Sequence, residues 1–317
     1  MRAFSYFLTA ALFAQETTFR ATVPVVLAPV TVTDAHGKLV DGLGIADFAV
    51  TDNGRAVRFQ LDTSDTINVP VALIVAVQTN DLSAAALLKI RKVGAMIQPL
   101  ITGERGFAAV LAVDQQVTVA QEFTQDPTAL TRAFQALLPG RARKTVALDA
   151  AARAVEMFRA RPAGERRVLL LIGEAKDRGS EATLEAVLEQ LQRENIQVYS
   201  ATYSVTRTQW TTKAAGRPKP SGGENDILAG LAELVRLGKT NDAEALALHT
   251  GGKKIGFATL HSLEEIVSRV GEELHGQYLL SFPASAPEGF HAVSVQLREP
   301  GKRTVAARQG YWAVASP

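Results

Sequence analysis

Two runs of consecutive apolar residues decide most about what this chain of 317 residues can fold into. The runs cover residues 71–77 and 168–172, and each has the length of a single strand. A strand in which every residue is apolar is typical of a parallel sheet that helices cover on both faces. A helical pattern follows the second run, with Leu184, Val187, Leu188 and Leu191 on one face. Strands that alternate with helices in this way predict an α/β fold with a doubly wound, mostly parallel sheet.

Small and polar residues mark the expected ends of three helices. Ser180 precedes the helix at 184–191 and is expected to cap it. Ser262 and Glu265 match a capping box at the start of a later helix, whose apolar stripe includes Leu263 and Val270. A further helix is expected over 227–249, and the pair Gly251-Gly252 is expected to end it.

The segments before and after this α/β region read as β structure. Asn53-Gly54 lies between two short strand patterns, and this dipeptide is a strong hairpin signal because both residues tolerate positive φ. Near the carboxyl end, apolar residues alternate over 293–297, and Pro300-Gly301 is expected to turn the chain into a partner strand at 305–307. We therefore expect an N-terminal β module at 18–68, an α/β domain at 69–282 and a C-terminal β segment at 283–317.

The first fourteen residues have the pattern of an export signal. Arg2 supplies a positive charge, residues 3–13 are almost wholly apolar, and Ala14 offers a small residue at the expected cleavage point. This stretch is shorter than the roughly 20 apolar residues that a membrane-spanning helix needs. We interpret residues 1–14 as a signal peptide and expect a secreted or periplasmic protein without a membrane span; the alternative is a buried N-terminal strand or helix.

Composition excludes several classes of function. The sequence contains no cysteine, which excludes disulfides, thiolate metal sites and a cysteine nucleophile. Its 34 basic and 32 acidic residues give a formal net charge of +2, without the basic excess of a general nucleic-acid binder. The sequence has no GxxxxGK[ST], HExxH or GxSxG motif, and its five histidines follow no metal-binding spacing. We therefore predict that the protein is not an enzyme and does not bind nucleic acid.

Short motifs along nearly the whole chain resemble the exported, acidobacterial-type proteins related to von Willebrand factor A domains. At the amino end these motifs are Val30-Thr31-Val32-Thr33-Asp34, Gly37-Lys38-Leu39-Val40, Gly42-Leu43, Asp47-Phe48 and Asp52-Asn53-Gly54. At the carboxyl end they are Thr250-Gly251-Gly252, Gln277-Tyr278-Leu279-Leu280 and Gly310-Tyr311-Trp312. Their order along one chain carries the resemblance, which implies the same doubly wound, von Willebrand factor A-like fold and a protein-binding function.

The resemblance also implies a metal-ion-dependent adhesion site, from which this sequence departs. In the family a DxSxS motif ends the first core strand, a threonine comes from a later loop, and an aspartate follows another strand. Here Val77 replaces the first aspartate, while Thr79 and Asp81 fall on the serine positions. Thr145 matches the loop threonine, and Glu174 the last aspartate. A second frame begins the motif at Asp81 and places Ala85 on its last serine.

Three interpretations of this altered site remain open. In the first interpretation, the domain binds no metal. Alternatively, Asp81, Glu174 and Thr145 hold Mg²⁺ or Mn²⁺ in altered geometry, since these ions prefer oxygen ligands. The third interpretation is that Lys144 supplies the missing positive charge by pairing with Asp81 or Glu174.

The segment 204–226 is a long stretch without periodicity, so it is either a functional loop or a mobile insertion. It carries Trp210 among basic residues, a contact suited to an acidic protein or a glycan. Thr79, Asp81, Thr145, Lys144, Glu174 and Trp210 are therefore the expected binding rim, at the carboxyl edge where doubly wound sheets bind ligands. We predict a protein-interaction module with a degenerate metal site and a protein or glycan partner. The alternative is a metal-dependent adhesion domain or an envelope enzyme.

Overall fold

The computed structural model describes residues 25–62, 69–80, 84–141, 144–162, 164–174, 177, 179–203, 241–256, 260–285 and 287–313. Its centre is a six-stranded sheet in the order β10-β9-β8-β5-β6-β7. The strands are β5 (Val71–Gln78), β6 (Phe107–Val113), β7 (Val117–Thr124), β8 (Arg166–Gly173), β9 (Gln197–Thr202) and β10 (Lys254–Gly256). All neighbours pair in parallel except β6 and β7. The predicted doubly wound, mostly parallel sheet is confirmed.

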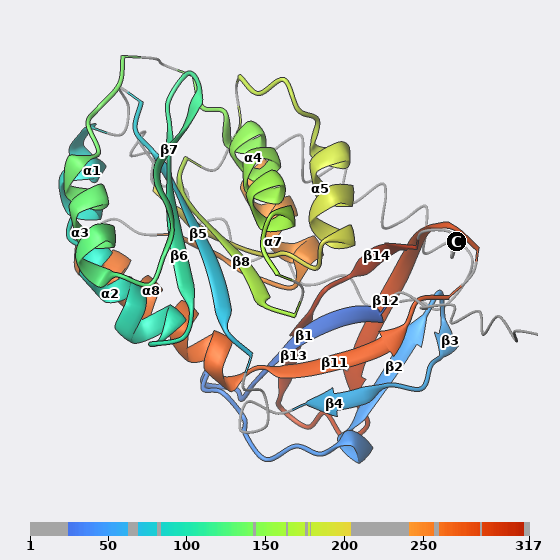
Figure 1. Cartoon of the computed structure of the whole chain (residues 1–317). Coiled ribbons are helices and arrows are strands. Elements are labelled where there is room, and N and C mark those ends of the chain that lie inside the picture. The colour runs from blue at the N-terminus through green and yellow to red at the C-terminus, as the bar shows by residue number, and fades with distance from the viewer. Residues whose placement is uncertain are drawn as a thin grey trace, which may run out of the picture.

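Helices cover both faces of this sheet (Figure 1). One face carries α1 (Ala84–Ile90), α2 (Gly94–Ile97), a π-helical turn at Gln98–Thr102, α3 (Pro127–Ala136) and α8 (Leu260–Gly276). The other face carries α4 (Ala147–Arg159), α5 (Leu184–Arg193) and α7 (Asp242–Thr250). Alternate residues of β5 enter the two cores: Val75 and Val77 pack toward α8, and Ile74 and Ala76 toward α4. This two-sided burial explains why every residue of the strand is apolar up to Gln78.

The β segments at the two ends of the chain share two antiparallel sheets. One has the order β13-β1-β11-β4 and the other β14-β12-β2-β3. Their strands are β1 (Val25–Thr33), β2 (Phe48–Asp52), β3 (Arg55–Ala56), β4 (Gln60–Asp62), β11 (Tyr278–Pro283), β12 (Gly289–Leu297), β13 (Thr304–Ala307) and β14 (Gly310–Ala313), with a 3₁₀ turn at Ile45–Asp47. The inner faces of both sheets form one apolar core, so we call this unit the β-sandwich.

Within the β-sandwich, the predicted hairpin is confirmed and one predicted pairing is wrong. Asn53 and Gly54 both have positive φ and join β2 to β3. The turn at Pro300-Gly301 does not return the chain to β12; β13 pairs with β1 in the other sheet. Because Val305 and Ala307 pack against the shared core from that sheet, alternation alone could not identify their partner strand.

The chain leaves the β-sandwich after β4, builds the α/β unit from β5 to α8, and returns at β11. Figure 1 shows the β-sandwich beside the lower end of the α/β unit. Buried Arg308 joins the two: its Nη1 donates to the Leu27 carbonyl and to Asn195 Oδ1, both at 2.8–2.9 Å, and its Nη2 to the Gln192 carbonyl at 3.2 Å. Burial lowers the pKa of Arg308 to about 10.

Two predicted helix ends are wrong, and one is confirmed. The side chain of Thr183, not Ser180, caps α5 by accepting from Ala186 N. Ser262 lies inside α8, which already begins at Leu260, so it forms no capping box. Gly251 ends α7 in the left-handed conformation, with φ of 84°, as the Gly-Gly pair predicts. The rest of the helix expected over 227–249 lies outside the described residues, as do the expected signal peptide and the whole loop at 204–226.

Candidate functional site

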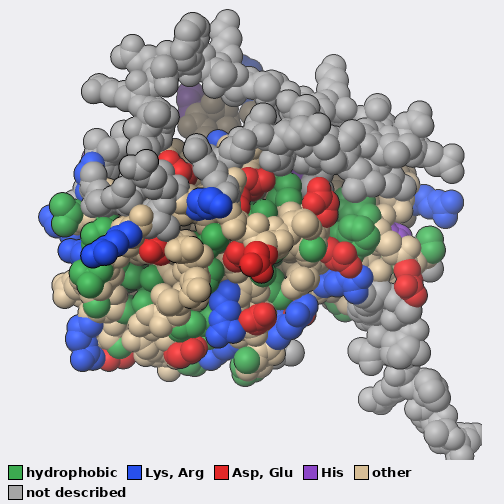
Figure 2. All heavy atoms as spheres, turned by 90° about the horizontal axis from the view of Figure 1, so that it is seen from above, with side chains coloured by type: hydrophobic (Ala, Val, Ile, Leu, Met, Phe, Trp, Pro, Cys, Tyr) green, Lys and Arg blue, Asp and Glu red, His purple; other side chains and the backbone are tan. Residues whose placement is uncertain are grey.

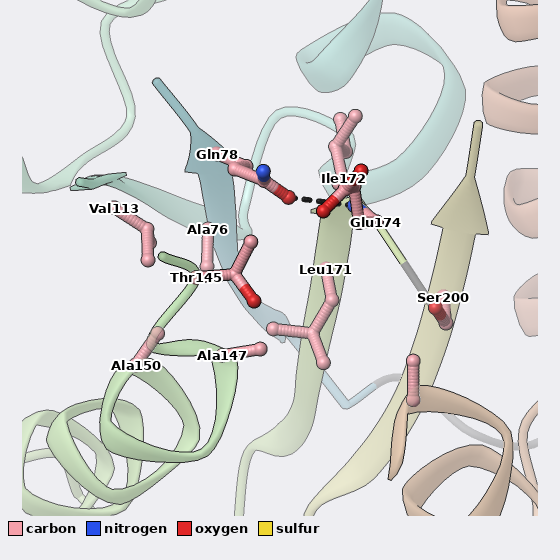
Figure 3. Close-up of a pocket in the computed structure, with 12 residues that line it drawn as sticks. Ala76, Gln78, Val113, Thr145, Ala147, Ala150, Leu171, Ile172, Glu174 and Ser200 are labelled. Atoms are coloured by element: carbon pink, nitrogen blue, oxygen red, sulfur yellow. Dashed lines mark hydrogen bonds between the residues drawn. The ribbon is translucent and has the colours of Figure 1, made fainter. Parts of the chain in front are cut away.

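Gln78 is the central side chain at the carboxyl edge of the parallel sheet. It ends β5, and its Oε1 accepts a hydrogen bond of 2.6 Å from the backbone N–H of Glu174, which follows β8 (Figure 3). Its Nε2 donates to Asn80 Oδ1 at 2.8 Å. A Cβ on Gly173 would lie 2.5 Å from Gln78 Oε1, so only glycine there leaves room for the amide. Gln78 thus ties the ends of β5 and β8 together.

The two residues after Gln78 are held by their backbone and side chains. Thr79 donates its N–H to the Val113 carbonyl at 2.8 Å, and its carbonyl accepts from Gly140 N at 2.5 Å. Asn80 Nδ2 donates to the Lys144 carbonyl at 3.3 Å. Both Thr79 and Asn80 are buried. The strand end is therefore fixed to the neighbouring strand and to the loop before α4.

The direction of the side chains shifts the site by one residue from its predicted place. Val77 packs into the core on the α8 side of the sheet, away from Thr145. Gln78 points to the α4 side, where it lines a small cavity with Thr145 and Glu174 (Figure 3). Gln78 and Asn80 therefore occupy the edge, and the sequence interpretation missed both. The signal available was the alternation of β5, because Gln78 shares a face with Ile74 and Ala76.

Two acids at the edge each have a buried oxygen without a hydrogen-bond partner among the described residues. They are Glu174 Oε2, after β8, and Asp114 Oδ1, after β6. Because β5 lies between β6 and β8, the two acids stand about 10 Å apart at the level of the backbone. The two carboxylates therefore come from the strands on either side of β5. Asp114 is the third residue that the sequence interpretation missed.

The loop after β8 is anchored on the start of α4. Asp177 Oδ2 accepts from Leu148 N at 3.0 Å and from the Ser180 hydroxyl at 2.7 Å. Ser180 Oγ in turn accepts from Asp149 N at 3.0 Å, and the Asp149 carboxylate accepts from Ala182 N. The Asp177 carboxylate and the Ser180 hydroxyl thus satisfy the Leu148 and Asp149 N–H groups in the first turn of α4, where negative charge is also favoured by the helix dipole. The loop therefore forms a fixed wall of the site.

The cavity between these groups is small. Its volume is about 20 Å³, and its walls are mostly alanine, valine, leucine and isoleucine side chains. A volume of this size accommodates about one or two water molecules. A small-molecule substrate would need several hundred Å³. This edge is therefore suited to contact a ligand from outside and not to enclose one.

The structure brings three of the predicted rim residues together and describes a fourth beside them. Thr145 is buried and lines the cavity with Glu174, and Thr79 lies at the adjacent strand end. Lys144 is exposed, and its side-chain stem lies over Gly179. No ion pair joins Lys144 to Glu174 among the described residues. Asp81 and Trp210 lie outside the described residues, so their roles stay predictions.

The described residues at this edge do not fit a magnesium or manganese site. Such ions need several oxygen ligands, usually with anionic charge. In the described part of the chain, no three His, Cys, Asp or Glu side chains are grouped as metal ligands. The Gln78 and Asn80 amides bond to each other, and Gln78 Oε1 already accepts from Glu174 N. An amide pair thus stands where a metal would need carboxylate and hydroxyl ligands.

In the view of Figure 2, acidic and basic side chains are interspersed over the described surface. None of the helices in the described part of the chain combines the length and apolar character needed to span a membrane.

Comparisons with known proteins find similar folds at low sequence identity. A von Willebrand factor type A protein from Catenulispora acidiphila is 10% identical over 92% of this chain and 75% of its own, with a TM-score of 0.48. An aerotolerance-related membrane protein from Bacteroides fragilis is 13% identical over 64% of this chain and 99% of its own, with a TM-score of 0.44. The conserved hypothetical protein BatB from Bacteroides thetaiotaomicron is 12% identical over 64% and 98%, with a TM-score of 0.43. No family model and no curated protein matches the chain.

Proposed function

We propose that this protein is a protein-interaction module, exported from the cytoplasm, that binds its partner at the carboxyl edge of the parallel sheet. The observation that carries the proposal is the Gln78 amide at the centre of that edge, bonded to Asn80 Oδ1 and to Glu174 N. It fixes the ends of β5 and β8 and the loop before α4 relative to one another. We call this set of residues the amide edge, consisting of Gln78, Thr79, Asn80, Thr145 and Glu174; Glu174 is its partly exposed member, and the other four are buried.

The chemistry of the amide edge supports binding and not catalysis. Its cavity of about 20 Å³ is too small to enclose a substrate. Glu174 is partly exposed at this edge, so its carboxylate can accept hydrogen bonds from N–H or O–H groups of a partner. The buried His291–Asp52 pair, which could otherwise suggest acid–base chemistry, lies in the β-sandwich and not at this edge. We therefore propose that the protein is not an enzyme.

We further propose that the amide edge is a degenerate metal-ion-dependent adhesion site in a von Willebrand factor A-like domain. Export is proposed from the pattern of residues 1–14 and from the resemblance to exported proteins. The partner is proposed to be a protein or glycan, with Trp210 and the basic residues of the 204–226 segment extending the contact.

The test is a binding assay with the chain that begins at Gln15, immobilised and exposed to extract of the cell envelope. A partner should bind the wild type and should be lost on Glu174→Arg, which places a bulky positive charge beside the cavity. Arg105→Glu, a substitution at the other end of the strands, is the matched control and should keep the partner. Equal binding by Glu174→Arg and the wild type contradicts the proposed edge.

Two further experiments test the role of the 204–226 segment and the proposal that no metal binds. Deletion of residues 206–223 should abolish binding without a change in melting temperature if this segment contacts the partner. Calorimetry with Mg²⁺, Mn²⁺ and Ca²⁺ should give no heat of binding and no thermal shift. Saturable heat with any of these ions would instead favour a metal-dependent adhesion domain.

A further inference from the structure

A second cavity lies at the opposite, amino end of the parallel strands. Its volume is about 390 Å³, which falls within the range of roughly 300–1,000 Å³ found for small-molecule sites. Val71, the first residue of β5, and Arg166, the first residue of β8, both line it. The turn at 102–105 and the end of α8 complete the walls. This cavity shares no residue with the amide edge.

Arg166 is a partly buried cation in this cavity with neutral partners. Its Nη1 donates to the Leu274 carbonyl, and its Nη2 donates to Gln277 Oε1 at 2.6 Å. In the part of the chain that the structure describes, no carboxylate forms an ion pair with Arg166. Burial lowers the pKa of Arg166, because taking the guanidinium out of water penalises its charged form. A counter-ion in the cavity would remove that cost.

The two hydrogen bonds of Arg166 also fix its direction. A guanidinium has five N–H donors in one plane, so bonds to Leu274 and Gln277 orient the remaining donors. Such an oriented fork matches the two oxygens of a carboxylate or phosphate group. The cation is therefore preorganised, and a ligand would not have to immobilise a flexible side chain.

The wall facing Arg166 is closely packed. A Cβ on Gly106 would lie 2.3 Å from the Thr102 carbonyl oxygen and 2.6 Å from the Val71 carbonyl oxygen, so glycine is needed where the turn meets β5. At the rim, Arg105 and His275 are exposed, with Glu104 as the one acid of the lining. The lining thus carries more basic than acidic groups, and its rim is open to solvent.

We propose that this cavity binds a small molecule through a carboxylate or phosphate group, with Arg166 as its counter-ion and Arg105 as a second contact at the rim. The proposal is independent of the amide edge, since it concerns other residues at the other end of the sheet. The ligand class follows from the charge and the fork geometry of Arg166. The volume admits a molecule of several heavy atoms beyond the anionic group.

The experiment is isothermal calorimetry and thermal unfolding of the chain from Gln15, with inorganic phosphate and with succinate as probes. Ionic strength is held constant with sodium chloride. One probe should bind saturably and raise the melting temperature, because a ligand that binds only the folded state stabilises it. The probe that binds better distinguishes a phosphate ligand from a carboxylate ligand.

Three variants give the comparison. Arg105→Gln removes an exposed charge and should weaken binding about threefold. Arg166→Lys keeps the charge but loses the fork, and should weaken binding about tenfold or more. Arg132→Gln, at an exposed arginine of α3, is the matched control and should bind as the wild type does.

Two results would overturn the proposal. One is the absence of saturable binding and of any thermal shift with both probes relative to chloride. The other is equal affinity in the wild type, Arg105→Gln and Arg166→Lys. If Arg166→Lys does not fold, the side-chain Nε–H resonance of Arg166 in the wild type decides instead: it should shift on titration with the bound probe, and an unchanged resonance would contradict the assignment.

Discussion

The imidazole Nδ1 of His291 lies 2.8 Å from an Asp52 carboxylate oxygen in the interior of the β-sandwich, and both side chains are almost fully buried. Nε2 of His291 lies 2.7 Å from the Pro287 carbonyl oxygen. The second Asp52 oxygen accepts from the Tyr311 hydroxyl at 2.8 Å. Asp52 on β2 therefore binds side chains from β12 and β14, and one carboxylate connects three strands of the same sheet.

Removal of the Asp52 carboxylate should lower the free energy of unfolding substantially. Asp52→Ala leaves His291 Nδ1 and the Tyr311 hydroxyl without their shared acceptor, and such losses in a buried pair cost about 3 kcal/mol. Denaturant unfolding monitored by circular dichroism measures the change. Glu122→Ala, an exposed acid on β7, is the control and should change stability by less than about 0.5 kcal/mol. A loss for Asp52→Ala as small as that of the control would contradict this role.

Tyr311 should make the fold sensitive to alkali. Burial, together with the Asp52 carboxylate, raises the pKa of Tyr311 to about 12, above its ordinary value of 10.0. The folded state therefore retains the phenol proton where the unfolded state loses it. Its contribution to stability is complete below pH 10 and disappears as pH rises through about 12. The difference in free energy of unfolding between the wild type and Tyr311→Phe should narrow over this range. A difference that stays constant from pH 9 to pH 12 would contradict the assignment.

Arg308 should determine whether the two units unfold together. Its hydrogen bonds to Asn195 and Gln192 cross from the β-sandwich to α5 and the residues after it, while its bond to the Leu27 carbonyl holds it on β1. Arg308→Lys keeps the charge but cannot reach these acceptors at once, because a lysine is a single point donor. Calorimetry should show one unfolding transition for the wild type and two for Arg308→Lys. Arg303→Lys, at an exposed arginine of the same segment, should keep one transition.

The amide edge should gain metal binding when its amides are replaced. Gln78→Asp and Asn80→Ser are combined with Leu82→Ser, a position outside the described residues that completes the DxSxS spacing counted from residue 78. Together they supply the carboxylate and hydroxyl oxygens that Mg²⁺ and Mn²⁺ prefer. The triple variant should bind Mn²⁺, detected by electron paramagnetic resonance, and the wild type should not. A control with Thr79→Ser alone should behave as the wild type. Failure of the folded triple variant to bind would mean that Gln78 does not hold the position of the first acid.

The core of the fold could be predicted from the sequence because its signals are local. The apolar run at 71–77 and the spacing of Leu184, Val187, Leu188 and Leu191 each identify an element without knowledge of its neighbours. The sequence carries no such local signal for which strand pairs with which. The pairing of β13 with β1, and not with β12, depends on which side of the shared core the strand reaches.

The site could be predicted only in part, for a related reason. The sequence motifs name the end of β5 and the loops near it, but Gln78 rather than Val77 points toward the cavity, which depends on the side of the sheet that faces α4. Ser180 precedes a helix in the sequence, yet its hydroxyl serves the start of α4, which is 31 positions away. Arg308 has no sequence signal of burial, because its acceptors are neutral and belong to distant segments.

The order of the strands also has a consequence for how the protein is made. Asp52 and Tyr311 are 259 positions apart, and the strands described beside β1 are β11 and β13, near the carboxyl end. A ribosome that releases the amino end first therefore delivers β1 and the β2–β3 hairpin long before β11, β12 and β13 exist. Pairings of such high sequence separation form slowly, since the entropy of loop closure must be overcome first. We therefore expect the β-sandwich to close last, when strands from the carboxyl side of the α/β unit reach β1 and β2.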